Sequence, residues 1–259
     1  MSESCVLRAT AVTKRFAGIV ALDRVDIEVA EGERVGLIGP NGAGKTTLFN
    51  CLLGLLRCDG GSVELDGQDI TRLRVHHRAR LGIGRTFQRI ELFPDSTVRE
   101  HLLIAERVRQ GNGRLWKDLL GLGRPQPDEI KRCDEVLELL GLAELADEPI
   151  ERLSLGKGRL VEVGRALMTQ PKLLLLDEPS SGLDRSETAA LADTLRAVQD
   201  DQGFAILLVE HDVELVAGFT SRCYLLDFGR MLTDGPTPTV MASDDMRRAY
   251  LGELEATPT

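Results

Sequence analysis

A glycine-rich segment at residues 39–47, GPNGAGKTT, most constrains what this chain can fold into. It directly follows the apolar run Arg34–Ile38 and precedes a helical pattern, TLFNCLLGLL. Glycines allow a backbone loop to curl until successive N–H groups face one phosphate chain. The segment fits GxxxxGK followed by Ser or Thr, so Lys45 would reach the β- and γ-phosphates and the Thr46 hydroxyl would bind Mg²⁺. The order of strand, glycine loop and helix predicts an α/β nucleotide-binding core.

A pair of adjacent acids supplies the second half of such a site. The run LLLLDEP at Leu173–Pro179 places Asp177 and Glu178 at the end of a four-leucine strand. Asp177 is suited to hold Mg²⁺ through water, and Glu178 is suited to polarise an attacking water as general base. The alternative is that both acids only cap the helix that follows.

Short apolar runs alternate with helical patterns along the chain, which predicts an α/β fold with a mostly parallel sheet. The runs are short, aliphatic and bounded by loop residues, as expected for strands buried on both faces. The predicted core strands are Arg34–Ile38, Ile83–Thr86, Leu173–Asp177 and Ala205–Glu210. Two further strands, Val25–Val29 and Ser62–Asp66, adjoin the turn sequences AEGE and DGG. They predict an antiparallel β-subdomain beside the core.

The segment from about residue 95 to residue 155 changes to a helical pattern. EHLLIAERV and DEIKRCDEVLELLGL place apolar residues at three- and four-residue spacing, which predicts a helical subdomain inserted into the α/β core. We expect one domain over residues 5–255 and a frayed tail at 256–259. Asp227–Gly229 reads DFG, and its place between two apolar runs predicts a hairpin turn.

Charge and hydropathy exclude several classes of protein. A formal net charge of -9 argues against generic nucleic-acid binding. The longest aliphatic runs, at 173–176 and 205–209, are far shorter than the roughly 20 apolar residues that cross a bilayer. The N-terminal sequence MSESCVLRAT has no apolar core of a signal peptide. Any role at a membrane would therefore be that of a peripheral subunit.

A second loop also has the features of an anion site. LSLGK at 153–157 places a serine, a glycine and a lysine just before an amphipathic helix. Unpaired backbone N–H groups and positive charge at a helix N-terminus attract an anion. One chain therefore carries two loops suited to phosphate.

With GPNGAGKTT, LSLGK and LLLLDEPSSGLD in that order, the chain resembles the ATP-binding subunits of ABC transporters over almost its full length. RTFQ at Arg85–Gln88 resembles the Q-loop of that family, and SGLD at Ser181–Asp184 resembles its D-loop. LLVEHD at Leu207–Asp212 resembles its switch region, with His211 as the histidine. The resemblance implies the fold of an ABC ATPase.

The resemblance also implies a head-to-tail dimer with two ATP molecules and Mg²⁺ between the subunits, so the two loops of one chain face different nucleotides. The nucleotide-binding residues would be Phe16, Gly39, Pro40, Asn41, Gly42, Ala43, Gly44, Lys45, Thr46 and Thr47. The signature residues that act on the partner's ATP would be Ser154, Leu155, Gly156 and Lys157. The D-loop residues would be Ser181, Gly182, Leu183 and Asp184. The Mg²⁺ ligands would be Thr46, Gln88 and Asp177, and the catalytic residues would be Glu178, His211 and Gln88.

Three of these residues have competing interpretations. Phe16 lies where the family stacks an aromatic ring on adenine, but it could be a core phenylalanine. His211 would bond the γ-phosphate and hold the geometry of Glu178 and its water, but it could be a structural histidine. Lys157 departs from the usual LSGGQ, as does Leu155; it could add charge near the partner's phosphates or be a solvated lysine at a helix start.

Details of the sequence favour the branched-chain amino acid importers within this family. They include GIGRTFQRIELFPDSTVREHLL, LDFGRMLTDG and AYLG at Ala249–Gly252. The resemblance implies two permease subunits, a second ATP-binding subunit, an extracytoplasmic solute-binding protein and a place at the cytoplasmic face of the membrane. Phe87–Pro94 would dock the permease, and Leu115, Trp116 and Leu119 either join that face or pack the subdomain. Lipopolysaccharide export and a non-transport regulatory role are the alternatives.

Overall fold

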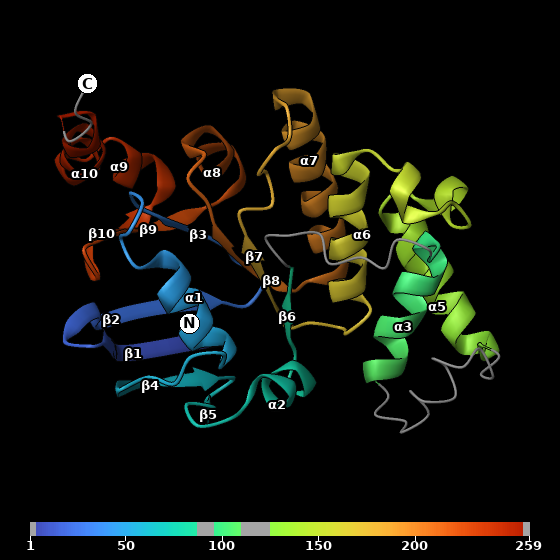
Figure 1. The fold of residues 1–259 in the computed structure, drawn as a ribbon, viewed down its shortest axis with the longest axis horizontal. Helices are drawn as coiled ribbons and strands as arrows, with labels where there is room; N and C mark the ends of the chain where they lie inside the picture. The colour runs from blue at the N-terminus through green and yellow to red at the C-terminus, as the bar shows by residue number, and fades with distance from the viewer. Residues whose placement is uncertain (1–3, 87–95, 110–124, 256–259) are drawn as a thin grey trace.

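The computed structural model describes residues 4–86, 96–109 and 125–255 of the 259-residue chain (Figure 1). An antiparallel sheet of order β2-β1-β4-β5 lies beside a six-stranded sheet of order β10-β9-β3-β8-β7-β6. The first sheet contains β1 (Cys5–Phe16), β2 (Ile19–Ala30), β4 (Gly60–Leu65) and β5 (Gln68–Asp69). The second contains β3 (Arg34–Ile38), β6 (Ile83–Arg85), β7 (Leu173–Asp177), β8 (Ala205–Val209), β9 (Arg222–Asp227) and β10 (Arg230–Pro236).

The larger sheet is parallel except for β10, which pairs antiparallel with β9. Its central strands are buried on both faces because alternate side chains enter two different hydrophobic cores. Leu174 and Leu176 of β7 pack in one core with side chains of the helices. Leu173 and Leu175 pack in the other core, with the antiparallel sheet and the first helix.

Helices cover the larger sheet and extend beyond its β6 edge (Figure 1). In chain order they are α1 (Lys45–Leu53), α2 (Val75–Arg80), α3 (Val98–Arg109), α5 (Pro127–Leu139), α6 (Leu155–Leu167), α7 (Arg185–Gln202), α8 (Val213–Phe219), α9 (Thr237–Met241) and α10 (Asp244–Glu255). Two 3-10 turns, Ala143–Leu145 and Ile150–Arg152, lie between α5 and α6. In Figure 1, α3, α5 and α6 stand together at one end, and α8 to α10 gather at the other.

This architecture confirms the predicted fold class: a mostly parallel α/β core, an antiparallel β-subdomain and helices inserted between β6 and β7. The strands Arg34–Ile38 and Leu173–Asp177 have the predicted bounds, and the other two core strands end one residue earlier than predicted. The DFG segment forms the turn between β9 and β10, as predicted. The domain limits 5–255 and 95–155 stay predictions. Gln88, Phe87–Pro94, Leu115, Trp116 and Leu119 lie outside the described residues.

A buried arginine fastens the C-terminal end of α1. The Arg78 side chain of α2 is 1% exposed. Its guanidinium donates to the carbonyl oxygens of Cys51 (2.8 Å) and Leu52 (2.6 Å), the last turn of α1, and to those of Thr71 (3.0 Å) and Leu73 (3.1 Å). Carbonyls at a helix end lack the usual donor one turn further along the helix, and the arginine supplies donors at this end. The Cys51 carbonyl also accepts from the Gly54 N–H at 3.2 Å. The helix that begins at the glycine loop is thereby fixed at its far end.

We expect Arg78→Met to lower the free energy of unfolding by about 2–4 kcal/mol, because it removes the arginine's hydrogen bonds to the carbonyls of Cys51, Leu52, Thr71 and Leu73. Urea unfolding followed by circular dichroism measures this change. Arg80→Met is the matched control, since Arg80 lies exposed on the same helix and should change stability by less than about 0.5 kcal/mol. Equal losses for the two variants would contradict the capping role.

Candidate nucleotide-binding site

The register of three parallel strands brings the predicted site together. β8 lies between β3 and β7, with Leu37 paired to Val209 and Val209 paired to Asp177. The loops that follow these strands therefore leave the sheet at the same edge and the same level. Ligands of open α/β sheets bind outside the carboxyl ends of the strands, which is where these loops lie.

The loop after β3 has the backbone conformation of a phosphate cradle. Gly39, Gly42 and Gly44 have φ angles of 151°, 79° and 108°, in the region that side chains disfavour. A Cβ on Gly39 would lie 2.0 Å from the carbonyl oxygen of Leu226, so no other residue fits there. Around Gly42 a Cβ would meet nothing within 4 Å, so this part of the loop is open.

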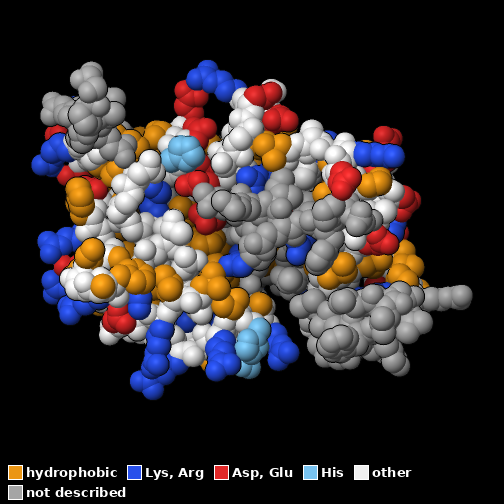
Figure 2. Space-filling model, viewed as in Figure 1, with side chains coloured by type: hydrophobic (Ala, Val, Ile, Leu, Met, Phe, Trp, Pro, Cys, Tyr) orange, Lys and Arg blue, Asp and Glu red, His pale blue; other side chains and the backbone are white. Residues whose placement is uncertain are grey.

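Lys45 is held inside the curve of this loop. Its side chain is buried, and its ammonium group donates to the carbonyl oxygens of Gly39 and of Pro40, the latter at 3.0 Å. The next residue, Thr46, is exposed at the first turn of α1. In Figure 2 the surface over this end of α1 is largely white, because backbone and small residues dominate it, and acidic side chains lie beside it. A buried cation and an open hydroxyl at a helix N-terminus suit a polyphosphate with its metal ion.

Segments distant in sequence support the loop. The Gly229 N–H of the β9–β10 turn donates to the carbonyl of Ala43 at 2.8 Å. The Gly39 N–H donates to the hydroxyl of Tyr250 on α10 at 3.2 Å. Tyr250 thus contacts the glycine loop directly, although the AYLG segment shows only a tyrosine on an amphipathic helix. No local pattern could have revealed this contact, because 211 positions separate the two residues.

Phe16 ends β1 opposite Ile19, and its side chain is 43% exposed. This exposure contradicts the alternative that Phe16 is a core residue. The same hairpin meets the glycine loop, since a Cβ on Gly44 would lie 2.9 Å from the carbonyl oxygen of Ala21. An exposed ring on this hairpin is available to stack on a flat base. The Lys14 ammonium lies 5.3 Å from the ring centroid.

The carboxylates after β7 form a crowded acidic group. Burial, and then the nearby charges of Glu178 and Glu210, raise the pKa of Asp177 to about 6. Glu178 has a φ of 45°, which is strained for a residue with a side chain. Its N–H donates to the carbonyl of Val209 on the neighbouring strand at 2.9 Å. Acids held together in this way favour a cation nearby, which fits the predicted Mg²⁺.

His211 is the second residue of the loop after β8 and lies near the same acids. Its Nδ1 atom lies 3.9 Å from Oε1 of Glu178 and 3.7 Å from Oε2 of Glu210. The imidazole is 58% exposed, which is unlike a buried structural histidine. The structure therefore brings His211, Glu178 and Asp177 together at the edge where the glycine loop opens.

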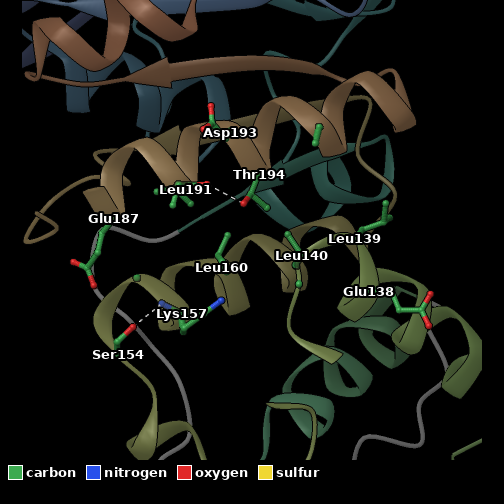
Figure 3. Close-up of a pocket in the computed structure, with 14 residues that line it drawn as sticks. Glu138, Leu139, Leu140, Ser154, Lys157, Leu160, Glu187, Leu191, Asp193 and Thr194 are labelled. Atoms are coloured by element: carbon green, nitrogen blue, oxygen red, sulfur yellow. Dashed lines mark hydrogen bonds between the residues drawn. The ribbon is translucent and has the colours of Figure 1, made fainter. Parts of the chain in front are cut away.

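The second predicted anion loop lies at the start of α6. Ser154 is the N-cap of that helix, and its Oγ accepts from the Lys157 N–H at 3.3 Å. Ser154 and Leu155 are exposed. Ser154 and Lys157 line one wall of a cavity of about 570 Å³ between α6 and α7, and Glu187 lines the other (Figure 3). An exposed helix N-terminus is the arrangement that binds an anion from outside the chain.

The loop that precedes α7 packs against the start of α6. A Cβ on Gly182 would lie 2.9 Å from Cδ2 of Leu155, so the glycine makes room for this side chain. Asp184 is the N-cap of α7, and its Oδ1 accepts from the Glu187 N–H at 2.8 Å. Ser181 and Leu183 complete this loop. The predicted signature and D-loop residues therefore form one continuous surface.

This fold, with a glycine loop, an acidic strand end and a separate exposed serine loop, defines an ATP-binding cassette. The chain belongs to the ABC transporter family, whose model matches residues 22–181. It is 39% identical to the high-affinity branched-chain amino acid transport ATP-binding protein LivG of Escherichia coli K12, over 96% of this chain and 98% of LivG. It is 36% identical to BraF of Pseudomonas aeruginosa, over 96% and 98%, a protein described in the same words.

Solved structures agree with this assignment. The ADP conformation of MJ1267, an ATP-binding cassette of an ABC transporter, matches with a TM-score of 0.86 and 31% identity, over 96% of this chain and 99% of that one. A nucleotide-free ATP-binding cassette from an ABC transporter matches with a TM-score of 0.84 and 30% identity, over 95% and 98%.

We expect Asp177→Asn to raise the free energy of unfolding at neutral pH, without nucleotide and in EDTA, by about 1–3 kcal/mol. The folded-state pKa of about 6 lies above the ordinary value of 3.8. The wild type therefore loses stability as pH rises between these values, and the variant does not. The gain should vanish below about pH 4, where both states of the wild type are protonated.

Chemical denaturation at several pH values measures this difference. Asp193→Asn is the control, because that side chain is 75% exposed in an ion pair with Arg196 and should change stability by less than about 1 kcal/mol. A variant less stable than the wild type at neutral pH would contradict the electrostatic cost at Asp177.

Proposed function

We propose that this chain hydrolyses Mg·ATP and that hydrolysis powers the import of a small solute, namely a branched-chain or related amino acid. The observation that supports the cargo is the 39% identity to LivG over nearly the whole of both chains. A second candidate is export of lipopolysaccharide, because the chain is also 34% identical to LptB of Haemophilus influenzae, a lipopolysaccharide export ATP-binding protein, over 96% and 98%.

In this proposal the described residues act through the positions given above, and Gln88 joins them as the resemblance to the family implies. Lys45 and the N–H groups of the glycine loop bind the phosphates. Thr46, Asp177 and Gln88 would hold Mg²⁺, which would neutralise phosphate charge when it is bound. Glu178 accepts a proton from the attacking water, and His211 orients that water and the γ-phosphate. Phe16 stacks on the base.

A second ATP-binding subunit completes the site. The Ser154 loop is exposed, and in Figure 1 helix α6, which it begins, stands apart from α1, which the glycine loop begins, so the Ser154 loop serves the nucleotide of a partner. ATP then joins the two subunits, with Gly156 and Lys157 near the partner's γ-phosphate. The Ser181–Asp184 loop packs on Leu155 and passes along the same interface.

A groove between the core and the inserted helices fits a permease segment. It encloses about 280 Å³ and is lined mainly by apolar side chains of α1, α2, β6, α3 and α6, among them Leu53, Val75, Ile104 and Ala105. Across the described ranges, no helix combines the length and apolarity needed to cross a membrane. We propose that two permease subunits dock in such grooves at the cytoplasmic face, with an extracytoplasmic solute-binding protein delivering the cargo.

Glu178→Gln should lower the rate of ATP hydrolysis by about 100-fold or more, because an amide cannot accept the proton, while ATP affinity is retained. Phosphate release and nucleotide titration measure the two quantities, and light scattering should show a dimer of this variant only with Mg·ATP. Lys131→Gln, an exposed site on α5, is the control. Unchanged turnover in Glu178→Gln would remove this residue as the base.

Reconstitution with the permease subunits in vesicles tests the cargo. Uptake of labelled leucine that requires ATP and is lost with Lys45→Ala supports amino acid import. ATPase activity stimulated by lipopolysaccharide, without solute uptake, would favour the export alternative. ATP-dependent binding to a protein other than a permease would favour a regulatory role.

A further inference from the structure

A fully buried carboxylate, that of Glu210, lies behind the acids of the site. Glu210 follows the last residue of β8 and has 0% exposure. Its Oε1 atom accepts from the N–H of Ser180 at 3.0 Å and from the Ser180 hydroxyl at 2.7 Å. Its Oε2 atom accepts from the N–H of His211 at 3.2 Å and from that of Asp212 at 3.5 Å. Each oxygen therefore serves a different loop.

The two loops are those that carry the hydrolytic residues. Ser180 comes two positions after Glu178 and directly before Ser181, where the D-loop begins. The Glu178 N–H is already fixed to the carbonyl of Val209 at 2.9 Å. The loop is thus attached to the end of β8 on both sides of Glu178, once through the backbone and once through the Glu210 side chain.

A buried carboxylate lowers the stability of the fold unless polar groups bind it, and a core packed from apolar side chains would not need it. Among the described residues, no lysine or arginine forms an ion pair with this carboxylate, and the nearest basic side chain is His211, whose Nδ1 lies 3.7 Å from Oε2. The remaining compensation comes from backbone N–H groups and one hydroxyl. A buried carboxylate offers two acceptor oxygens with about four lone-pair sites, whereas an amide of the same shape offers one oxygen. An amide could reach both loops only by donating its NH2 to the Ser180 hydroxyl, and the Ser180 N–H, which now donates to Oε1 at 3.0 Å, would then lose its acceptor.

We propose that Glu210 is a positioning residue for ATP hydrolysis: its carboxylate joins the Glu178 loop to the His211 loop and so sets the separation of these two side chains. This inference rests on the proposed ATPase function. Because Ser180 directly precedes Ser181, the same carboxylate also fixes the start of the D-loop. The Glu210 side chain bonds to residues 180, 211 and 212, and none of these hydrogen bonds reaches residues 39–47 of the described chain, so we expect its main effect on the hydrolytic step and not on phosphate binding at the glycine loop.

Steady-state ATP hydrolysis by Glu210→Gln tests the proposal. We expect kcat to fall about tenfold, since a small displacement of aligned groups has effects of this size or larger, while KM and nucleotide affinity stay within about twofold. Glu129→Gln is the control, because Glu129 is a buried carboxylate on α5, far from these loops in the chain. It should leave kcat unchanged. A Glu210→Gln variant with unchanged kcat would overturn the proposal.

Ser180→Ala keeps the proposal testable if Glu210→Gln does not fold, because it removes only the hydroxyl donor. We expect a kcat reduction of about threefold for this variant. In the double variant the two effects should combine to less than their product, since both act through one contact. If the two substitutions multiplied independently, Ser180 and Glu210 would not act through one contact, and the proposed link between the two loops would be contradicted.

Hydrogen exchange of the Ser180 and His211 amides provides a readout that does not need hydrolysis. Both should exchange faster in Glu210→Gln, while amides of β3 stay unchanged. If exchange is faster in the variant but the wild type has no ATPase activity, the link between the two loops through Glu210 is supported and the proposed function is rejected. Unchanged exchange at both amides would show that Glu210 does not hold the two loops together.

Discussion

Parallel pairing of β3, β8 and β7 is the constraint on which the rest of the structure depends. Because Leu37, Val209 and Asp177 lie in one register, the three loops that follow start from the same line. The phosphate cradle, the acids and the histidine then need only short loops to meet. Both faces of this sheet are covered by hydrophobic cores, so the strands are held in place by burial rather than by the site itself.

The site is built against the local preferences of its residues. Burial and neighbouring carboxylates raise the pKa of Asp177, and Glu178 holds a positive φ. Such features cost stability and persist where the surrounding structure enforces them. The contacts that enforce the geometry are identifiable: the Val209 carbonyl accepts from the Glu178 N–H, and the Glu210 carboxylate accepts from the N–H groups of Ser180 and His211. Besides burial itself, the Glu210 carboxylate therefore raises the pKa of Asp177, and it also fixes the two loops of the site.

Much of the fold could be predicted because its signals are local. A glycine loop between an apolar strand and a helix, and an acid pair after four leucines, each specify their own geometry over a few residues. The bounds of β3 and β7 were therefore predictable to the residue. The strand β1 was not predicted, because its alternation is interrupted by register shifts against β2. The contact of Leu155 with Gly182 was also not predictable from either segment alone.

The sequence by itself determined the local chemistry: which loop is rich in glycine and carries a lysine, which acids follow a buried strand and which serine begins a helix. Those properties depend on neighbours within one loop or one helical turn. Only the tertiary structure decided which loops meet and what holds them together. Tyr250 reaches Gly39, Arg78 caps α1 and Glu210 joins two loops through contacts between positions distant in the chain. Such contacts depend on the packing of whole elements, which no short stretch of sequence encodes.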